Sequence, residues 1–267
     1  MSATLASIHI YPLKSCSPLA LEDAVIGKRG IDHDRRWMAV DATGKFLTGR
    51  QYPRLTLIRA EPDDDGLRLS APDMPELRLL PTATQAARVD VQVWKSRIAS
   101  LSANAVADAW ISTFLGLSAR LVYMDSACTR DVDPDFSLAG DEVSFADGYP
   151  LLLISQAALV QLNARLARPV PMLRFRPNLV VAGTPPHAED GWNRVRIGAV
   201  EFDVVKPCIR CVFTTVDFEH GRFDASGEPL RTLLTYRRTS KGVSFGQNLI
   251  PRRLGTIRTG DTVHVMA

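Results

Sequence analysis

Lys-Pro-Cys-Ile-Arg-Cys-Val-Phe-Thr-Thr-Val-Asp, residues 206–217, is the stretch from which the rest of the chain can be interpreted. Residues 200–205 before the thiols alternate as a strand does, and residues 212–216 after them are rich in β-branched side chains. The pattern therefore predicts a strand on each side of Cys208 and Cys211, with the two thiols at the bend between them. The end of a strand holds a side chain more rigidly than a free loop does.

Positive charge accompanies both thiols in the sequence, because Arg210 stands between them and Lys206 precedes them. Neighbouring cations favour the thiolate, which is the form that binds metal or attacks an electrophile. Two buried inert thiols remain an alternative. A zinc site would need a second pair of ligands, and a thioredoxin-like redox pair would lie at a strand-to-helix junction. One thiolate that binds a soft metal fits the basic setting better than a disulfide.

Composition sets the broad class of the protein. The chain has 267 residues, 46% hydrophobic and 23% charged, which is ordinary for one large or two smaller soluble domains. A net charge of +3 without a basic stripe gives no reason to expect nucleic acid, and no apolar run approaches the ~20 residues of a membrane span. No export signal is evident, and four scattered cysteines do not make a disulfide scaffold. We therefore expect a cytoplasmic protein without a membrane partner.

The order of elements predicts a mainly β protein with a few helices, of α+β class. Helices are predicted at residues 104–115 with a stop at Gly116, after the capping residue Ser155, and at residues 229–237 with Leu230, Leu233 and Leu234 inward. Short strands separated by turn signals are predicted at residues 5–11, 24–27, 35–40, 46–47, 55–60, 67–69, 77–80, 89–93, 120–124, 150–154, 179–181, 195–197, 200–205, 212–216, 243–250 and 262–265.

Many short strands with few helices indicate barrel or sandwich architecture. Residues 125–148 are polar and irregular and follow a strand-rich block, so we place a domain boundary at their start. The predicted domains are residues 1–124, a barrel-like N-terminal domain, and residues 125–267, a second β-barrel domain. A ligand held by residues of both domains would lie between them.

Three short segments pair a cation with a hydroxyl or amide at a strand end or in a loop. They are Lys14-Ser15, Asp34-Arg35-Arg36 and Arg176-Pro177-Asn178. Phosphate accepts many hydrogen bonds and suits the arginine fork, although solvated surface charge is the usual fate of such residues. Motifs for a dinucleotide fold, a P-loop or a histidine metal site are missing from the sequence, and a calcium-loop spacing at residues 131–142 has Phe136 where glycine is required.

Taken together, five motifs in register resemble the MOSC-domain proteins that carry an N-terminal MOSC β-barrel domain. This group includes bacterial MOSC N-hydroxylamine reductases and the mitochondrial amidoxime-reducing components. The motifs span nearly the whole chain: Tyr11-Pro12-Leu13-Lys14-Ser15-Cys16, Asp34-Arg35-Arg36-Trp37, Phe175-Arg176-Pro177-Asn178, Cys208-Ile209-Arg210-Cys211 with Thr214-Thr215-Val216-Asp217, and Phe245-Gly246-Gln247-Asn248.

The resemblance implies a molybdenum–molybdopterin cofactor, with the second cysteine of the CxRC motif, Cys211, as the catalytic metal ligand. The residues that it implies around the pterin and its phosphate are Lys14, Ser15, Arg35 and Arg176, with Asn178 close by and Ile209 and Arg210 beside the ligand. Neither an iron–sulfur cluster nor pyridoxal phosphate is expected in this chain, since the ferredoxin domain of some bacterial relatives is missing from the sequence.

The resemblance also implies an activity, the reduction of N-hydroxylated compounds at molybdenum. The electrons would come from a separate ferredoxin-like or cytochrome-type protein. A sulfur or cofactor carrier, with Cys211 as persulfide or thiolate, is the alternative, as is a storage protein without turnover. Within the cysteine pair we expect Cys211 to have the closer cation, Arg210, if that side chain points the same way, and Cys208 to pack as a small apolar residue.

Overall fold

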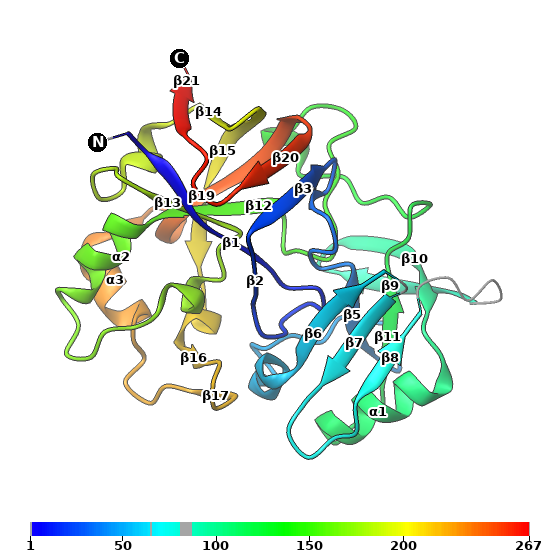
Figure 1. Ribbon diagram of the computed structural model, residues 1–267. Coiled ribbons are helices and arrows are strands. Elements are labelled where there is room, and N and C mark those ends of the chain that lie inside the picture. Colours follow the sequence, from blue (N-terminus) through cyan, green and yellow to red (C-terminus); the bar gives the residue numbers. More distant parts are fainter. Residues whose placement is uncertain (1, 65, 81–86, 267) are drawn as a thin grey trace.

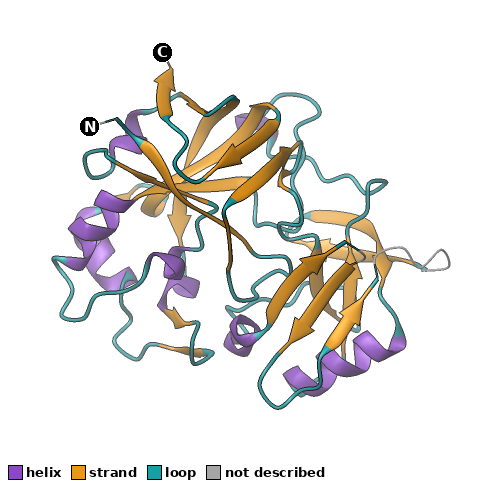
Figure 2. Ribbon diagram, viewed as in Figure 1, coloured by secondary structure: helices purple, strands orange, loops and turns teal. Residues whose placement is uncertain are grey.

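The computed structural model describes residues 2–64, 66–80 and 87–266. The described chain is mainly β with a few helices, which confirms the predicted fold class. Figure 1 shows two strand-rich lobes, one around β12 to β21 and one around β5 to β11 with α1 on its outer side. Figure 2 shows how strands dominate both lobes.

The largest sheet in the described residues has the order β2–β1–β13–β12–β19–β15–β14–β21, with β18 paired to β19. Its strands are β1 (Thr4–Ile10), β2 (Leu19–Leu21), β12 (Leu151–Ser155), β13 (Leu179–Ala182), β14 (Arg194–Ile197), β15 (Val200–Arg210), β18 (Arg238–Thr239), β19 (Gly242–Arg253) and β21 (Val263–Met266).

The N-terminal strand β1 belongs to this sheet, far from its sequence neighbours. It runs antiparallel to β13, with Leu5 opposite Val181 and Ile8 opposite Leu179. Leu5 and Ile8 are buried in one core cluster with strands from the C-terminal half of the chain. The domain boundary near residue 124 stays a prediction. Strands β1 and β2 precede it in the sequence, yet they belong to the large sheet formed mostly by the C-terminal half of the chain.

Four smaller sheets complete the fold of the described residues, and two of them, β5–β11–β10–β9 and β6–β7–β8, build the second lobe. The other two are β20–β3–β4 and β16–β17. The strands of the four sheets are β3 (Asp23–Gly27), β4 (Gly30–Ile31), β5 (Trp37–Asp41), β6 (Arg59–Asp63), β7 (Gly66–Ser70), β8 (Leu77–Leu79), β9 (Arg88–Val93), β10 (Ser96–Ser102), β11 (Ala119–Tyr123), β16 (Val216–Asp217), β17 (Arg222–Phe223) and β20 (Gly255–Arg258).

Three α-helices and five 3-10 helices lie in the described residues. They are α1 (Ala105–Leu115), α2 (Gln156–Asn163), α3 (Leu230–Tyr236), η1 (Pro53–Leu57), η2 (Pro134–Phe136), η3 (Met172–Phe175), η4 (Ala188–Gly191) and η5 (Val212–Thr215). Within the described ranges, no helix has the length and apolar character needed to cross a membrane.

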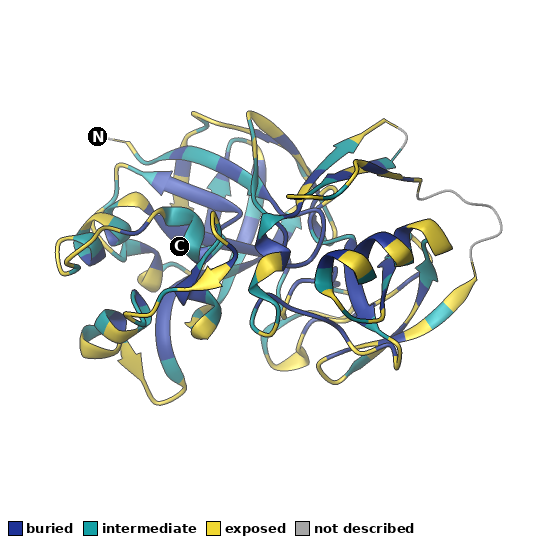
Figure 3. Cartoon of the chain, turned by 90° about the horizontal axis from the view of Figure 1, so that it is seen from below, coloured by how far each residue is buried: buried dark blue, intermediate teal, exposed yellow. Residues whose placement is uncertain are grey.

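Helix α1 shows how local sequence sets its ends. The Asn104 side chain accepts a hydrogen bond from the Ala107 backbone N–H, and Gly116 ends the helix with φ of 70°. Trp110 and Phe114 are buried against the sheets of the second lobe. Figure 3 shows the opposite face of this helix exposed. The predicted capping of α2 is also confirmed, because Ser155 accepts from the Ala158 N–H.

The strand predicted at residues 212–216 is wrong, and so is the bend before it. Strand β15 continues through Cys208 to Arg210, pairing with β19, and residues 212–215 form the 3-10 helix η5. The hydroxyls of Thr214 and Thr215 donate back to the carbonyls of Cys211 and Val212, at 3.0 and 2.8 Å. Such local bonds offset the β preference of the branched side chains.

Other differences from the prediction are smaller. Residues 53–57 form η1 before β6 begins, and residues 46–47 contribute only an isolated bridge from Phe46 to Val40. The strands β10 and β20 are missing from the predicted set. Leu234, predicted to face inward, is 46% exposed, while Leu233 is fully buried.

Candidate functional site

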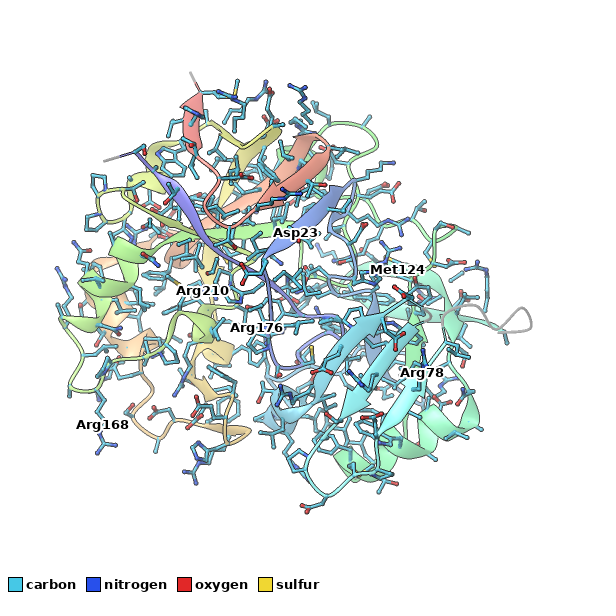
Figure 4. The ribbon with its side chains drawn as sticks, viewed as in Figure 1. Asp23, Arg78, Met124, Arg168, Arg176 and Arg210 are labelled. Carbon is cyan, nitrogen blue, oxygen red and sulfur yellow. The ribbon has the colours of Figure 1, made fainter. Side chains whose placement is uncertain are left out.

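A cleft of about 830 Å³, measured with its open mouth, lies between residues from both halves of the chain. All eight residues predicted for the site line it: Lys14, Ser15, Arg35, Arg176, Asn178, Ile209, Arg210 and Cys211. Figure 4 shows Arg176 and Arg210 near the middle of the molecule. We call this cavity the central cleft.

Three of the cleft residues have left-handed backbone conformations that side chains other than glycine rarely adopt. Ser15, Arg35 and Arg176 have φ of 71°, 49° and 54°. Arg176 directly follows η3, whereas Ser15 and Arg35 lie in turns between strands. Backbone strain of this kind costs of order 1–3 kcal/mol per residue and gathers at ligand-binding sites.

Arg35 and Arg176 contact the buried ring of Tyr11. Their guanidinium carbons lie 4.4 and 3.9 Å from its centroid. The Tyr11 hydroxyl donates to the Pro177 carbonyl at 3.1 Å, and burial raises the pKa of Tyr11. One aromatic ring therefore supports both arginines, which arrive from segments about 140 residues apart.

Asn178 has every hydrogen-bonding group of its side chain occupied by protein. Its Nδ2 donates to the His9 carbonyl and to Asp34, both at 3.1 Å. Its Oδ1 accepts from Arg35 Nη1 at 3.0 Å and from the Leu152 N–H at 3.2 Å. With two donors and two lone pairs used, the amide positions Arg35 and has nothing left for a ligand.

Asp147 joins two cations at the cleft. It accepts from Lys14 Nζ at 2.7 Å and is paired with Arg50. Burial acts to raise the pKa of Asp147, yet the Lys14 and Arg50 charges outweigh it and hold that pKa well below its usual range. Burial lowers the pKa of Lys14 to about 8. These two cations are thus largely neutralised within the protein.

The loop that carries Asp147 is held by a second buried arginine. Arg130 donates to the carbonyls of Ser144, Ala146 and Asp147, at 2.8, 2.5 and 2.9 Å. Burial lowers the pKa of Arg130 to about 10, which leaves it charged near neutral pH. The irregular backbone around Asp147 is fixed by these bonds rather than by a strand.

The two cysteines of the CxRC segment contact different arginines. Arg210 Nη1 donates to Cys208 Sγ at 2.8 Å, whereas Arg50 Nε donates to Cys211 Sγ at 3.2 Å. The expectation that Arg210 is the cation nearest Cys211 is therefore wrong. Because residues 208–210 lie on strand β15, side chains two apart point to the same face of it.

Lys206 also differs from its predicted place beside the sulfurs. Its Nζ lies 3.9 Å from the centroid of the Phe136 ring and 5.8 Å from that of Tyr149. The charge is thus held by aromatic faces. The positive charge near the thiols comes from Arg210, on the same strand as Cys208, and from Arg50, which is 161 residues from Cys211 in the sequence.

Arg50 and Asp147 are the residues that sequence reasoning missed. Arg50 follows Gly49, whose N–H donates to Ser15 Oγ at 3.0 Å and whose position leaves no room for a Cβ beside Phe213. A glycine followed by an arginine in a short turn was the only available signal. Asp147 stood among several acidic residues in an irregular stretch, so nothing set it apart.

Two groups of residues with different charge balance line the cleft. The Asp147 group, Lys14, Arg50, Asp147 and Cys211, contains its own counter-charge. The Arg176 group is Arg176, Arg210 and Cys208, in which Arg210 also donates to the Phe175 carbonyl at 2.6 Å.

The Arg176 group lacks a carboxylate partner within the described ranges, and two of its nitrogens, Arg176 Nη2 and Arg210 Nε, are buried without hydrogen-bond partners. Over the same described ranges, six cations line the cleft against one carboxylate, Asp147. Buried unsatisfied donors are costly, so their presence indicates an anionic ligand.

Comparison with known protein families identifies the family to which this chain belongs. Residues 2–118 match the family described as MOSC N-terminal beta barrel domain, and residues 140–264 match the MOSC domain. The chain belongs to the MOSC-domain proteins with an N-terminal MOSC β-barrel, which confirms the resemblance.

Curated relatives extend over almost the whole chain. The chain is 37% identical to mitochondrial amidoxime-reducing component 1 of Mus musculus, over 98% of this chain and 82% of that protein. It is 34% identical to the Homo sapiens component 1, over 98% and 83%. Among solved structures, the YUAD protein from Bacillus subtilis matches with a TM-score of 0.47 and 12% identity, covering 100% of this chain and 98% of that one.

Proposed function

We propose that this protein is a molybdenum cofactor-dependent reductase that converts N-hydroxylated compounds from N–OH to N–H. The observation that carries the proposal is Cys211, a thiol on a cleft lined by six cations against one carboxylate within the described residues. The relatives named for amidoxime reduction, at about a third identity over nearly the full chain, support the same activity.

The residues present fit a molybdopterin. A thiolate at Cys211, next to Arg50, is a ligand suited to a soft metal. The unpaired guanidinium nitrogens of Arg176 and Arg210 can donate to a phosphate, with Arg35 and Ser15 on the same cleft. When bound, the cofactor supplies a metal centre that exchanges two electrons and removes oxygen.

The protein's own residues would then orient the substrate and supply protons. Reduction of R–NHOH to R–NH₂ consumes two electrons and two protons and releases one water. Lys14 Nζ, whose pKa is about 8, holds a proton 2.7 Å from Asp147, whose side chain is 49% exposed. Lys14 can donate this proton within the cleft and regain one from solvent, while the ionised Asp147 holds the ammonium in place. Arg50 Nε donates to Cys211 Sγ at 3.2 Å and so holds the sulfur in place on the cleft.

We further propose that electrons come from a separate ferredoxin-like or cytochrome-type protein. The sequence carries no dinucleotide-binding motif such as GxGxxG. Reduced viologen dyes should therefore drive turnover of the purified chain, while NADH or NADPH alone should not. Turnover with a pyridine nucleotide alone would contradict this part of the proposal.

The deciding experiment measures metal, pterin and turnover on protein purified from a host that makes the cofactor. We expect molybdenum and pterin near one per chain and reduction of an amidoxime by dye electrons. Persulfide on Cys211 without molybdenum would instead identify a sulfur carrier. Full cofactor content without turnover of any N-hydroxylated compound would identify a storage protein.

A further inference from the structure

A second cavity adjoins the central cleft and has no part in the function proposed so far. It has a volume of about 770 Å³ with its open mouth. We call it the side cavity, and it is lined by Lys45, Phe46, Thr48, Arg50, Gln51, Gln92 and Trp94. Arg50 lines both cavities, so the side cavity opens beside the Asp147 group.

Trp94 gives the side cavity an unusual surface. Its side chain is 48% exposed, and its backbone has φ of 54°, a left-handed conformation that is a clear outlier for a bulky residue. It occupies the tight turn between β9 and β10, where Gln92 Nε2 donates to its carbonyl at 2.8 Å. The two-residue hairpin turn requires such a backbone, and it keeps a large aromatic ring at the surface beside the cavity, where the ring can contact a ligand.

Phe46 supports the Trp94 ring from within. The two ring centroids are 5.0 Å apart with planes at 60°, and Phe46 is only 8% exposed. The edge-to-face contact holds the indole in place, and the rest of the indole surface stays exposed beside the cavity. The side cavity is therefore a preformed aromatic site rather than a loose surface groove.

The charges that line the side cavity determine which aromatic groups can bind in it. Arg50 Cζ lies 5.1 Å from the Trp94 centroid, and Lys45 also lines the cavity, while no carboxylate lines it in the described part of the chain. A cationic ligand would be repelled by these two charges. The cavity accordingly suits a flat aromatic group that is neutral or anionic.

The Arg50 side chain links the side cavity to Cys211 in the central cleft. Arg50 contacts the Trp94 ring with its guanidinium and, through Nε, lies 3.2 Å from Cys211 Sγ. We propose that the side cavity is the substrate-selecting subsite, in which Trp94 stacks on the aryl group of a neutral or anionic N-hydroxylated compound whose N–OH group reaches the central cleft. This inference rests on the proposed function, because it names the substrate class of the same site.

The test compares substrates and variants on cofactor-loaded protein. Trp94→Ala should raise KM for a neutral aryl amidoxime roughly three- to tenfold, the loss expected for one aromatic contact. The KM for a short aliphatic hydroxylamine and the molybdenum content should stay unchanged. Trp94→Phe should restore most of the preference. Phe223→Ala, at another exposed aromatic residue that lines neither cavity, is the matched control.

A second measurement needs no turnover. Ligand-observed NMR with benzamide, a neutral unreactive aryl amide, should show binding to the cofactor-free wild type and the Phe223→Ala variant, and weaker binding to Trp94→Ala. Binding without any N-reduction would keep the subsite and overturn the proposed function. Equal benzamide binding in all three proteins, no binding in any, or an unchanged aryl preference in Trp94→Ala would overturn the subsite.

Discussion

The Asp147 group and the Arg176 group both bring cations and a cysteine to one cleft, yet they treat charge in opposite ways. In the first, Asp147 pairs with Lys14 and Arg50, and Arg50 also donates to Cys211. In the second, Arg176 and Arg210 each keep a buried nitrogen without a partner. The difference suggests a division of work, with proton and thiolate chemistry in one group and anion binding in the other.

The largest expected effect separates the two cysteines. Cys211→Ser should abolish N-reduction and disturb the molybdenum spectrum, because Cys211 belongs to the Asp147 group and is the proposed metal ligand. Cys208→Ser should keep the metal and much of the activity with a stability loss of about 1 kcal/mol, since serine still accepts from Arg210. Molybdenum content and dye-driven turnover of each variant check this. Complete loss in both would favour a dithiol mechanism.

The next effect concerns phosphate binding by the Arg176 group. Charge-assisted hydrogen bonds contribute roughly 1.5–3 kcal/mol each, so Arg176→Ala should lower pterin occupancy several-fold. Arg50→Ala should lower it less, because Asp147 already balances the Arg50 charge. Pterin content after gel filtration is the measurement, with thermal melting to verify folding. Equal pterin retention in the two variants would erase the distinction between the groups.

The smallest effect is a pH dependence confined to the Asp147 group. Burial lowers the pKa of Lys14 from 10.5 to about 8, so between these values the unfolded chain binds more protons than the folded one. Relative to Lys14→Met, wild-type stability should therefore rise from pH 8 to pH 10.5, by about 3 kcal/mol. Below pH 8 the difference should be flat.

Urea unfolding at several pH values measures this difference for Lys14. Arg176→Met serves as the control, because it removes a cation of the other group and leaves Lys14 in place, so its curve should run parallel to that of wild type. A Lys14→Met curve that also runs parallel to wild type would show that burial of the Lys14 ammonium has no such cost.

How far the sequence predicts this site depends on the range of the interactions. Local patterns predict α1 with its stop at Gly116 and the helix capped by Ser155, because the contacts that set them are a few residues apart. The eight predicted site residues meet in one cleft, and family motifs made that possible.

What the sequence cannot predict is which partner each side chain selects. Arg50 reaches Cys211 across 161 residues and Asp147 across 97, and no periodic pattern encodes such contacts. The 3-10 helix at residues 212–215 also depends on the choice of partners. Two threonine hydroxyls there donate to nearby backbone carbonyls, and the segment becomes helical despite its high β preference.

The place of β1 in the large sheet determines when that sheet can form while the chain is being synthesised on the ribosome. Strand β1 leaves the ribosome well before its partner β13, which begins at Leu179. At synthesis rates of about 5–20 residues per second, the β1 segment waits roughly ten to thirty seconds for that partner. Lys14 and Ser15 follow β1 directly, so their loop is fixed only after most of the chain has been made. The cleft is thus a late product of synthesis, and a nascent chain halted before residue 179 should be unable to retain pterin.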